Sequence, residues 1–195
     1  MILTTKMLME QYRQYSNPMS KIRRLVKQGE LVPFIRGLYE TDPNTPGHYL
    51  AGILYGPSYL SFDYALGYHG LIPEAVHNYT SATYDKRRGK QYHTPFGTYV
   101  YQDVPRAAYP HGVVLRMENG YSFQIAIPEK ALCDKLYSIS PAGSLRRVEE
   151  LLLDDLRLDH GDLQNLSGPD VRLLSGHYGS SNVRLLAEYL QRSAR

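Results

Sequence analysis

The sequence predicts an α+β protein in which helices at both ends flank a small, largely antiparallel sheet. Two observations lead to this class. Between residues 78 and 126 apolar and β-branched side chains recur with a period of two, whereas on either side they recur with helical spacing. In addition, Asn119-Gly120 separates two strand-like runs, and this dipeptide is the strongest short signal for a hairpin turn. The 195 residues, 43% of them hydrophobic, suffice to bury a core.

The N-terminal residues predict two helices followed by a hairpin. The first helix covers residues 4–15, and the second runs to Gln28, with Asn17 as its N-cap, Pro18 at its first position and Gly29 after its end. One face of the second helix is apolar and the other is basic. Two short strand-like runs in residues 30–39 follow. This is the organisation of a winged helix-turn-helix, and a helical hairpin with a solvated charged face is the alternative.

A cluster of turn formers at residues 41–47 predicts a linker, so we expect a DNA-binding domain at residues 1–45 and a second domain at residues 46–195. The second domain begins with two helices, the later one capped by Ser61. Its strands are expected at residues 80–84, 98–102, 113–117 and 121–125. C-terminal helices follow: one starting at Pro128, a long one from Ser144 to about Gly161, and two shorter ones near residues 169–174 and 181–190.

Few residues carry the patterns of catalytic or metal chemistry. The chain has one cysteine, Cys133, which excludes an intramolecular disulfide and a cysteine-rich zinc site, and we expect a buried, inert thiol there. Glycine loops for phosphate and the GxSxG elbow do not occur, and the seven histidines lack ligand spacing. We therefore predict no catalytic residues, no metal site, no cofactor and no enzyme activity.

The charge is modest overall but locally concentrated. With 22 Lys+Arg against 19 Asp+Glu, the net charge of +3 does not mark a polybasic protein. The N-terminus lacks a signal-peptide pattern, and no apolar stretch approaches the ~18 residues of a membrane span. We expect a cytoplasmic protein without membrane contact. A secondary basic patch is predicted at a loop tip formed by Lys86, Arg87, Arg88 and Lys90.

Tyrosine is the unusual residue of this composition, with 18 copies and no tryptophan. Twelve of them lie between Tyr49 and Tyr121. We favour packing on the half-buried faces of a sheet. A recognition surface for a protein partner is the second interpretation, since tyrosine is enriched in binding hot spots. Stacking of bases beside Arg87 and Arg88 is the third.

Four short segments together resemble a known family. Residues 61–74 read SFDYALGYHGLIPE, residues 94–99 read TPFGTY, and residues 126–134 read AIPEKALCD. Near the N-terminus, LVKQGEL at residues 25–31 is followed by RGLY at residues 36–39. In this order the segments resemble AbiEi-type antitoxins, which belong to type IV toxin–antitoxin and abortive-infection (phage defence) systems. The resemblance covers most of residues 18–137.

The resemblance implies an N-terminal winged helix that represses the antitoxin's own operon and a C-terminal domain that supplies antitoxicity. Its partners would be operator DNA and a neighbouring nucleotidyltransferase toxin, which such antitoxins counteract without a stable complex. Family members usually have one more helix before the helix pair, so we expect a trimmed module here. Carried over to this chain, the DNA-binding positions are Ser20, Lys21, Arg23, Arg24 and Lys27 on the second helix and Arg36 in the wing.

The alternative from a different class is a stand-alone interaction or regulator module. It would use a Tyr-rich surface of the middle region and would have no toxin partner.

Overall fold

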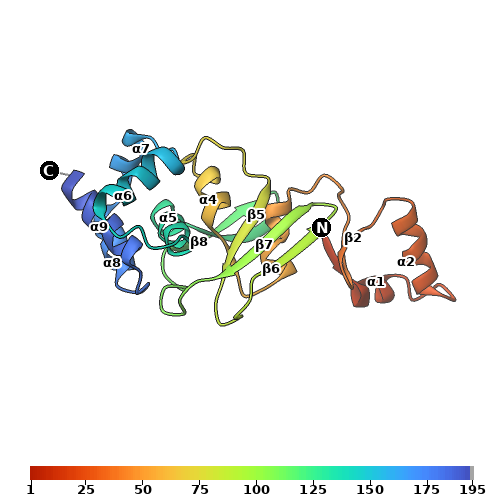
Figure 1. Cartoon of the computed structure of the whole chain (residues 1–195). Coiled ribbons are helices and arrows are strands. Elements are labelled where there is room, and N and C mark those ends of the chain that lie inside the picture. The colour runs from red at the N-terminus through yellow and green to blue at the C-terminus, as the bar shows by residue number, and fades with distance from the viewer. Residues whose placement is uncertain (194–195) are drawn as a thin grey trace.

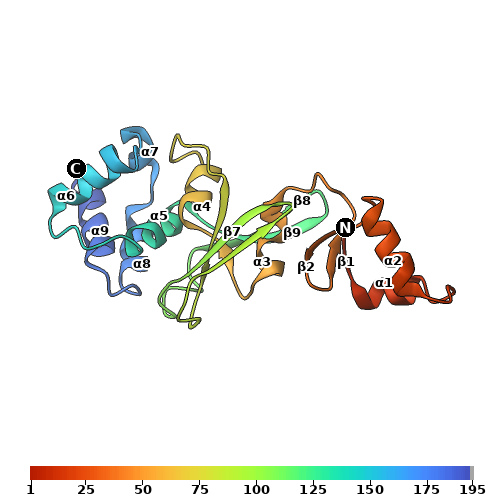
Figure 2. The ribbon, with the colours of Figure 1, turned by 45° about the vertical axis from the view of Figure 1, so that its right-hand side comes forward.

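The computed structural model describes residues 1–193 and has a mixed α+β architecture with two sheets. Figure 1 shows the N-terminal helices and small sheet at one end, the large sheet in the middle and the C-terminal helices at the other end. The turned view in Figure 2 keeps this order. The predicted α+β class is confirmed. None of the helices within residues 1–193 is long and apolar enough to cross a membrane.

The first 45 residues form two helices on a three-stranded antiparallel sheet in the order β1-β3-β2. Thr4 Oγ1 accepts from Met7 N (3.1 Å), and Asn17 Oδ1 accepts from Ser20 N (3.0 Å), so both helices begin at capping residues. The second helix was predicted at the residues where it occurs. The first strand was missed, because a strand of three residues is too short to show an alternating pattern of apolar and polar side chains. The elements are β1 (Ile2–Thr4), α1 (Thr5–Gln11), α2 (Pro18–Lys27), β2 (Val32–Ile35) and β3 (Leu38–Glu40).

These residues have a small buried cluster of their own, and they also contact the larger core. The Phe34 ring of β2 meets the Phe96 ring edge to face, with 6.0 Å between ring centroids. The division at residue 45 itself stays a prediction. The members of the small cluster are Leu3, Leu8, Ile22, Leu25 and Leu31.

The large sheet has six strands in the order β6-β7-β5-β4-β9-β8. Its middle is mixed, because β5 runs parallel to β7 and β4 runs parallel to β9, while the other neighbours are antiparallel. The prediction of a largely antiparallel sheet was therefore wrong at these two pairings. The strands are β4 (Tyr59–Leu60), β5 (Asn78–Thr83), β6 (Lys90–Thr94), β7 (Gly97–Asp103), β8 (Val113–Glu118) and β9 (Tyr121–Ala126).

The missed strand β6 explains the unexpected parallel pairing of β5 with β7. Without it, β5 and β7 would be consecutive strands and would be expected to form a hairpin. β6 reverses the chain between them, so β7 returns beside β5 in the same direction. As an edge strand with Lys90, Gln91 and His93 exposed, β6 has no apolar alternation that a sequence pattern could reveal.

The Asn119-Gly120 hairpin was predicted correctly. Both residues have positive φ (49° and 79°), as a type I′ turn requires, and β8 pairs with β9 in continuous register.

Helices cover the sheet and form the C-terminal end. The predicted long helix ends earlier than expected, at Asp155 after a π-helical turn, and a separate short helix follows. Ser61 precedes α4, but Thr80 Oγ1 accepts from Tyr64 N (2.9 Å) in its place. The helices are η1 (Gly47–Leu50), α3 (Ala51–Leu54), α4 (Phe62–Tyr68), α5 (Pro128–Tyr137), α6 (Leu145–Glu150), η2 (Leu151–Asp155), α7 (His160–Asn165), α8 (Gly168–Ser175) and α9 (Ser181–Ser193).

Candidate nucleic-acid interface

Helix α2 separates an apolar from a basic face. Ile22 and Leu25 are buried against the rest of the N-terminal elements. Around a helix that turns by about 100° per residue, the opposite side presents Ser20 and three basic residues within an arc of about 100°. All four side chains on this side are exposed: Ser20, Arg23, Arg24 and Lys27.

The basic side chains on this face are not neutralised by neighbouring acids. Within residues 1–193 the ion pairs of the protein lie elsewhere, such as Arg13 with Glu10 (2.9 Å) on the side of α1. Arg24 and Lys27 lie in the last turn of α2, where the helix dipole favours positive charge. The positive charge on this face is therefore available to an external anion.

Arg36, the sixth predicted DNA-binding residue, lies in the turn between β2 and β3. It is exposed, and the following Gly37 has φ +84°, a conformation that side chains rarely adopt. The carbonyl oxygen of Gly37 accepts from Thr5 N (2.9 Å) and from Thr5 Oγ1 (3.3 Å). These bonds fix the turn to the start of α1, so the position of Arg36 is set relative to the helices.

Lys21 differs from its neighbours on α2. It is half-buried, and its Nζ lies 5.7 Å from the ring centroid of Tyr12 and 5.8 Å from that of Tyr15. Cation–π contact of this kind holds the ammonium group against the α1 side. Lys21 therefore helps to join the two helices, while the remaining basic residues of α2 point to solvent.

The second basic set lies on the loop between β5 and β6, except that Lys90, predicted at the loop tip, is the first residue of β6. The shape of the loop depends on Asp103, whose Oδ2 accepts from the backbone N of Lys86 and of Arg87 (2.7 Å each). The Lys86 side chain already has partners within the protein, because its Nζ donates to Gly56 O (3.3 Å) and lies over the Tyr55 ring. Arg87, Arg88 and Lys90 are exposed.

The structure does not bring the two basic sets together. The β5–β6 loop lies at one end of β6, and the turn at the other end carries Phe96, which contacts the N-terminal elements through Phe34. Figures 1 and 2 both show the loop at the end of the sheet away from α2. We therefore treat the α2 face and the loop as separate surfaces.

The tyrosines of the middle region mostly pack inward. Of the twelve between Tyr49 and Tyr121, only Tyr68 is exposed, at 40%. Tyr99 and Tyr101 are 1% exposed, and burial raises the pKa of both hydroxyls. Their hydroxyls donate to Gly47 O (2.9 Å) and Ala51 O (2.7 Å), which tie the sheet to η1 and α3. This arrangement favours packing over an open recognition surface.

Sequence reasoning missed a buried polar network centred on Asp134 of α5. The carboxylate is fully buried and accepts from Tyr59 (3.0 Å), Ser61 (2.6 Å) and Tyr178 (2.5 Å). Lys130, one helical turn earlier and equally buried, lies 3.1 Å from the same carboxylate. Burial lowers the pKa of Lys130, and the Asp134 charge opposes this shift. The i,i+4 Lys–Asp spacing within an apolar helix was the available signal.

This network gives the AIPEKALCD segment a structural role. Lys130 Nζ also donates to Ala108 O (2.8 Å) and Tyr178 Oη (2.6 Å). Glu129 Oε1 accepts from Ser167 N (2.8 Å) at the residue that caps α8. The segment thus joins β4, α5 and the C-terminal helices. Cys133 beside it is fully buried, and burial raises the pKa of its thiol.

The described residues do not form a metal site. Within residues 1–193 no three His, Cys, Asp or Glu side chains are grouped so that they could hold a metal ion. Three of the histidines show other roles: His69 Nε2 contacts Ala126 O (2.8 Å), and His111 stacks on His177 with 4.3 Å between ring centroids.

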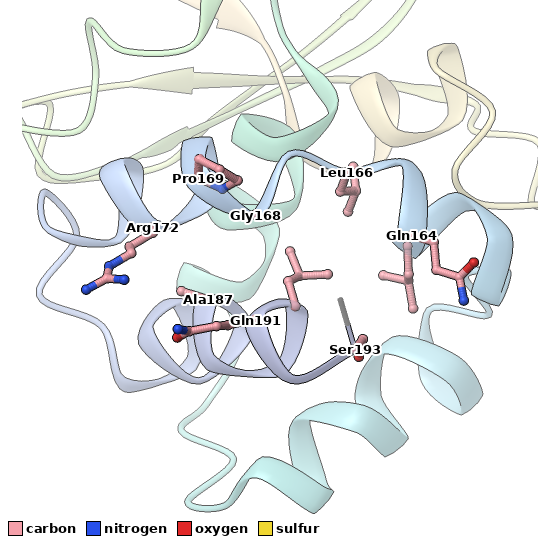
Figure 3. Close-up of a pocket in the computed structure, with 10 residues that line it drawn as sticks. Gln164, Leu166, Gly168, Pro169, Arg172, Ala187, Gln191 and Ser193 are labelled. Atoms are coloured by element: carbon pink, nitrogen blue, oxygen red, sulfur yellow. The ribbon is translucent and has the colours of Figure 1, made fainter. Parts of the chain in front are cut away.

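An apolar groove of about 720 Å³ lies between α7, α8 and α9. Figure 3 shows Arg172 and Gln191 toward one side of it, and Leu166 and Gln164 toward the other. Arg172 is its one ionisable lining residue, so the groove suits an apolar group rather than proton transfer. The lining residues are Leu163, Gln164, Leu166, Gly168, Pro169, Arg172, Ala187, Leu190, Gln191 and Ser193.

Comparison with known proteins gives a likeness of fold. No protein-family model matches the chain, and no curated protein matches it in sequence. Among solved structures, the chain is similar to the crystal structure of the RV2827C protein from Mycobacterium tuberculosis, with a TM-score of 0.56 and 19% sequence identity. The match covers 98% of this chain and 71% of that one. At this identity the similarity shows a shared fold.

Proposed function

We propose that this chain is the antitoxin and transcriptional autoregulator of a type IV toxin–antitoxin system, related to AbiEi-type antitoxins. In this proposal residues 1–45 act as a winged helix-turn-helix that binds the operator of its own operon. Residues 46–195 counteract a nucleotidyltransferase toxin encoded beside it. The chain acts by binding and has no catalytic activity of its own.

The exposed basic face of α2 is the observation that carries the proposal. Arg23, Arg24 and Lys27 stand together on the side opposite to buried Ile22 and Leu25, without acidic partners in residues 1–193. In helix-turn-helix proteins the second helix lies in the major groove, and its exposed side chains reach phosphates and base edges. In this proposal Arg36, in the turn between β2 and β3, acts as the wing residue and contacts the flanking DNA backbone.

The four resembling segments support the toxin–antitoxin part of the proposal. Two of these segments have a structural role in the second domain. Residues 61–74 contribute Ser61, and residues 126–134 contribute Asp134, to one buried network. A shared fold does not by itself define a partner. Protection against the toxin is therefore tested separately from binding to the operator.

The double variant Arg23→Ala/Arg24→Ala tests the assignment in cells. A reporter driven by the region upstream of the gene is expected to rise about tenfold or more when this variant replaces the natural chain, because two phosphate or base contacts are lost. Protection against the co-expressed nucleotidyltransferase is expected to persist, since both residues lie outside the second domain.

Arg184→Ala is the matched control, because this exposed arginine of α9 lies at the opposite end of the molecule and its loss removes the same kind of charge. It should leave repression unchanged. Full repression by the double variant would refute the role of α2. Failure of the natural chain to protect against the neighbouring toxin would refute the antitoxin role.

A further inference from the structure

The two edges of the large sheet differ in chemistry. β6 presents Lys90, Gln91 and His93, and polar and charged residues of this kind prevent further strand pairing. β8, at the other edge, exposes Leu115 at 63% and Met117 at 77%. These are the two most exposed aliphatic side chains on any strand within residues 1–193. Arg116 is the one exposed charged side chain of β8, so this edge carries less polar protection than β6.

The backbone of β8 is also prepared for pairing. Ile127 N donates to Gly112 O (2.8 Å), and β8 and β9 pair in the same continuous register. Hydrogen-bonded pairs alternate along an antiparallel ladder, so residues 114, 116 and 118 face β9. The N–H and C=O groups of Val113, Leu115 and Met117 then point away from the sheet. The outward backbone groups and the exposed apolar side chains thus belong to the same residues.

We propose that β8 pairs antiparallel with β8 of a second copy of this chain, around a two-fold axis at Leu115. This register places Leu115 opposite Leu115 of the second copy, Val113 opposite Met117, and Val114 opposite Arg116. Five residues of each strand pair, and apolar side chains meet on one face. The inference is independent of the proposed function, because it uses none of the residues assigned to DNA binding.

Charge and the number of paired residues favour this register over those centred on the next two residues. Centring the axis on Arg116 would place two arginines directly opposite each other, which is destabilising. Centring it on Met117 would pair only residues 116–118 of the strand and continue into the Asn119-Gly120 turn. The self-complementary sequence around Leu115 favours a second copy over an unrelated strand, since an isologous contact needs one patch that fits itself.

The first test introduces charged residues at the β8 edge. Sedimentation velocity of the full chain over a range of concentrations then measures whether it dimerises. The natural chain is expected to sediment as a dimer, and Leu115→Lys/Met117→Lys as a monomer at the same concentrations. Both positions are exposed, so circular dichroism of the variant should be unchanged. Leu173→Lys, at a position 67% exposed on α8, should remain a dimer. A monomeric natural chain, or a dimer insensitive to the β8 variant, would overturn the proposal.

Disulfide trapping tests the register. Cys133 is fully buried, so an introduced surface cysteine is the reactive thiol. Leu115→Cys should form a covalent dimer with a mild oxidant, because directly opposed Cα atoms are about 5.5 Å apart, within disulfide reach. Two copies of Met117→Cys would lie about 14 Å apart along the strands and should not cross-link. Efficient cross-linking of Met117→Cys with none for Leu115→Cys would contradict the Leu115 axis.

Discussion

Asp134→Ala is expected to lower the free energy of unfolding by about 3–5 kcal/mol, because it leaves the Lys130 ammonium group buried without a counter-ion. The same change removes the acceptor for Tyr59, Ser61 and Tyr178. For a chain of this length the loss corresponds to a fall of roughly 6–20 °C in melting temperature. Urea unfolding followed by circular dichroism measures the effect.

Asp63→Ala is the matched control. Asp63 of α4 pairs with Lys135, which lies on α5 like Asp134, at an oxygen–nitrogen distance of 2.6 Å. Both side chains of this pair reach solvent, with Asp63 37% and Lys135 21% exposed. Solvent screening limits such a pair to about 1 kcal/mol or less. If the two variants unfold at the same urea concentration, the Asp134 network does not stabilise the fold in the way that its burial indicates.

Gly47→Ala is expected to destabilise the chain by about 2–3 kcal/mol through overpacking. A Cβ atom at this position would overlap the Tyr79 ring and lie 2.5 Å from the backbone oxygen of Phe96. Relief would require the backbone to move, and the Gly47 carbonyl also accepts the Tyr99 hydroxyl (2.9 Å). The melting temperature should therefore fall measurably.

The exposed Gly52 of α3 provides the comparison. A Cβ there would meet its nearest atom at 3.9 Å, an ordinary contact, and alanine is a better helix former by about 1 kcal/mol. Gly52→Ala should be neutral or stabilising. If the two variants have the same melting temperature, the tight packing around Gly47 does not contribute to stability. Residues 41–47 would then behave as an open linker.

Short-range sequence signals correctly predicted those helix ends and turns that depend only on neighbouring residues. Asn17 and Pro18 start α2, Gly29 follows its end, and Asn119-Gly120 turns the β8–β9 hairpin, because each depends on neighbouring residues. The basic side chains of α2 could be placed on one face for the same reason.

The rest depends on residues far apart in the chain. β6 is a polar edge strand without an apolar period, and the parallel pairing of β5 with β7 follows from it. The buried network joins Asp134 to Tyr59 and Tyr178, which are 75 and 44 residues away in sequence. No spacing rule connects such residues, so only the folded chain places them together.

Binding to the DNA upstream of its own gene, measured against salt concentration, tests the central claim most directly. The account predicts that the natural chain binds this duplex more tightly than an unrelated duplex of equal length. The logarithm of the binding constant should fall with log salt with a slope of about −3 to −4, given four exposed basic residues at about 0.9 each. In Arg23→Ala/Arg24→Ala the slope should shrink by about 2. Equal affinity for both duplexes, or an unchanged slope in the variant, would contradict the account.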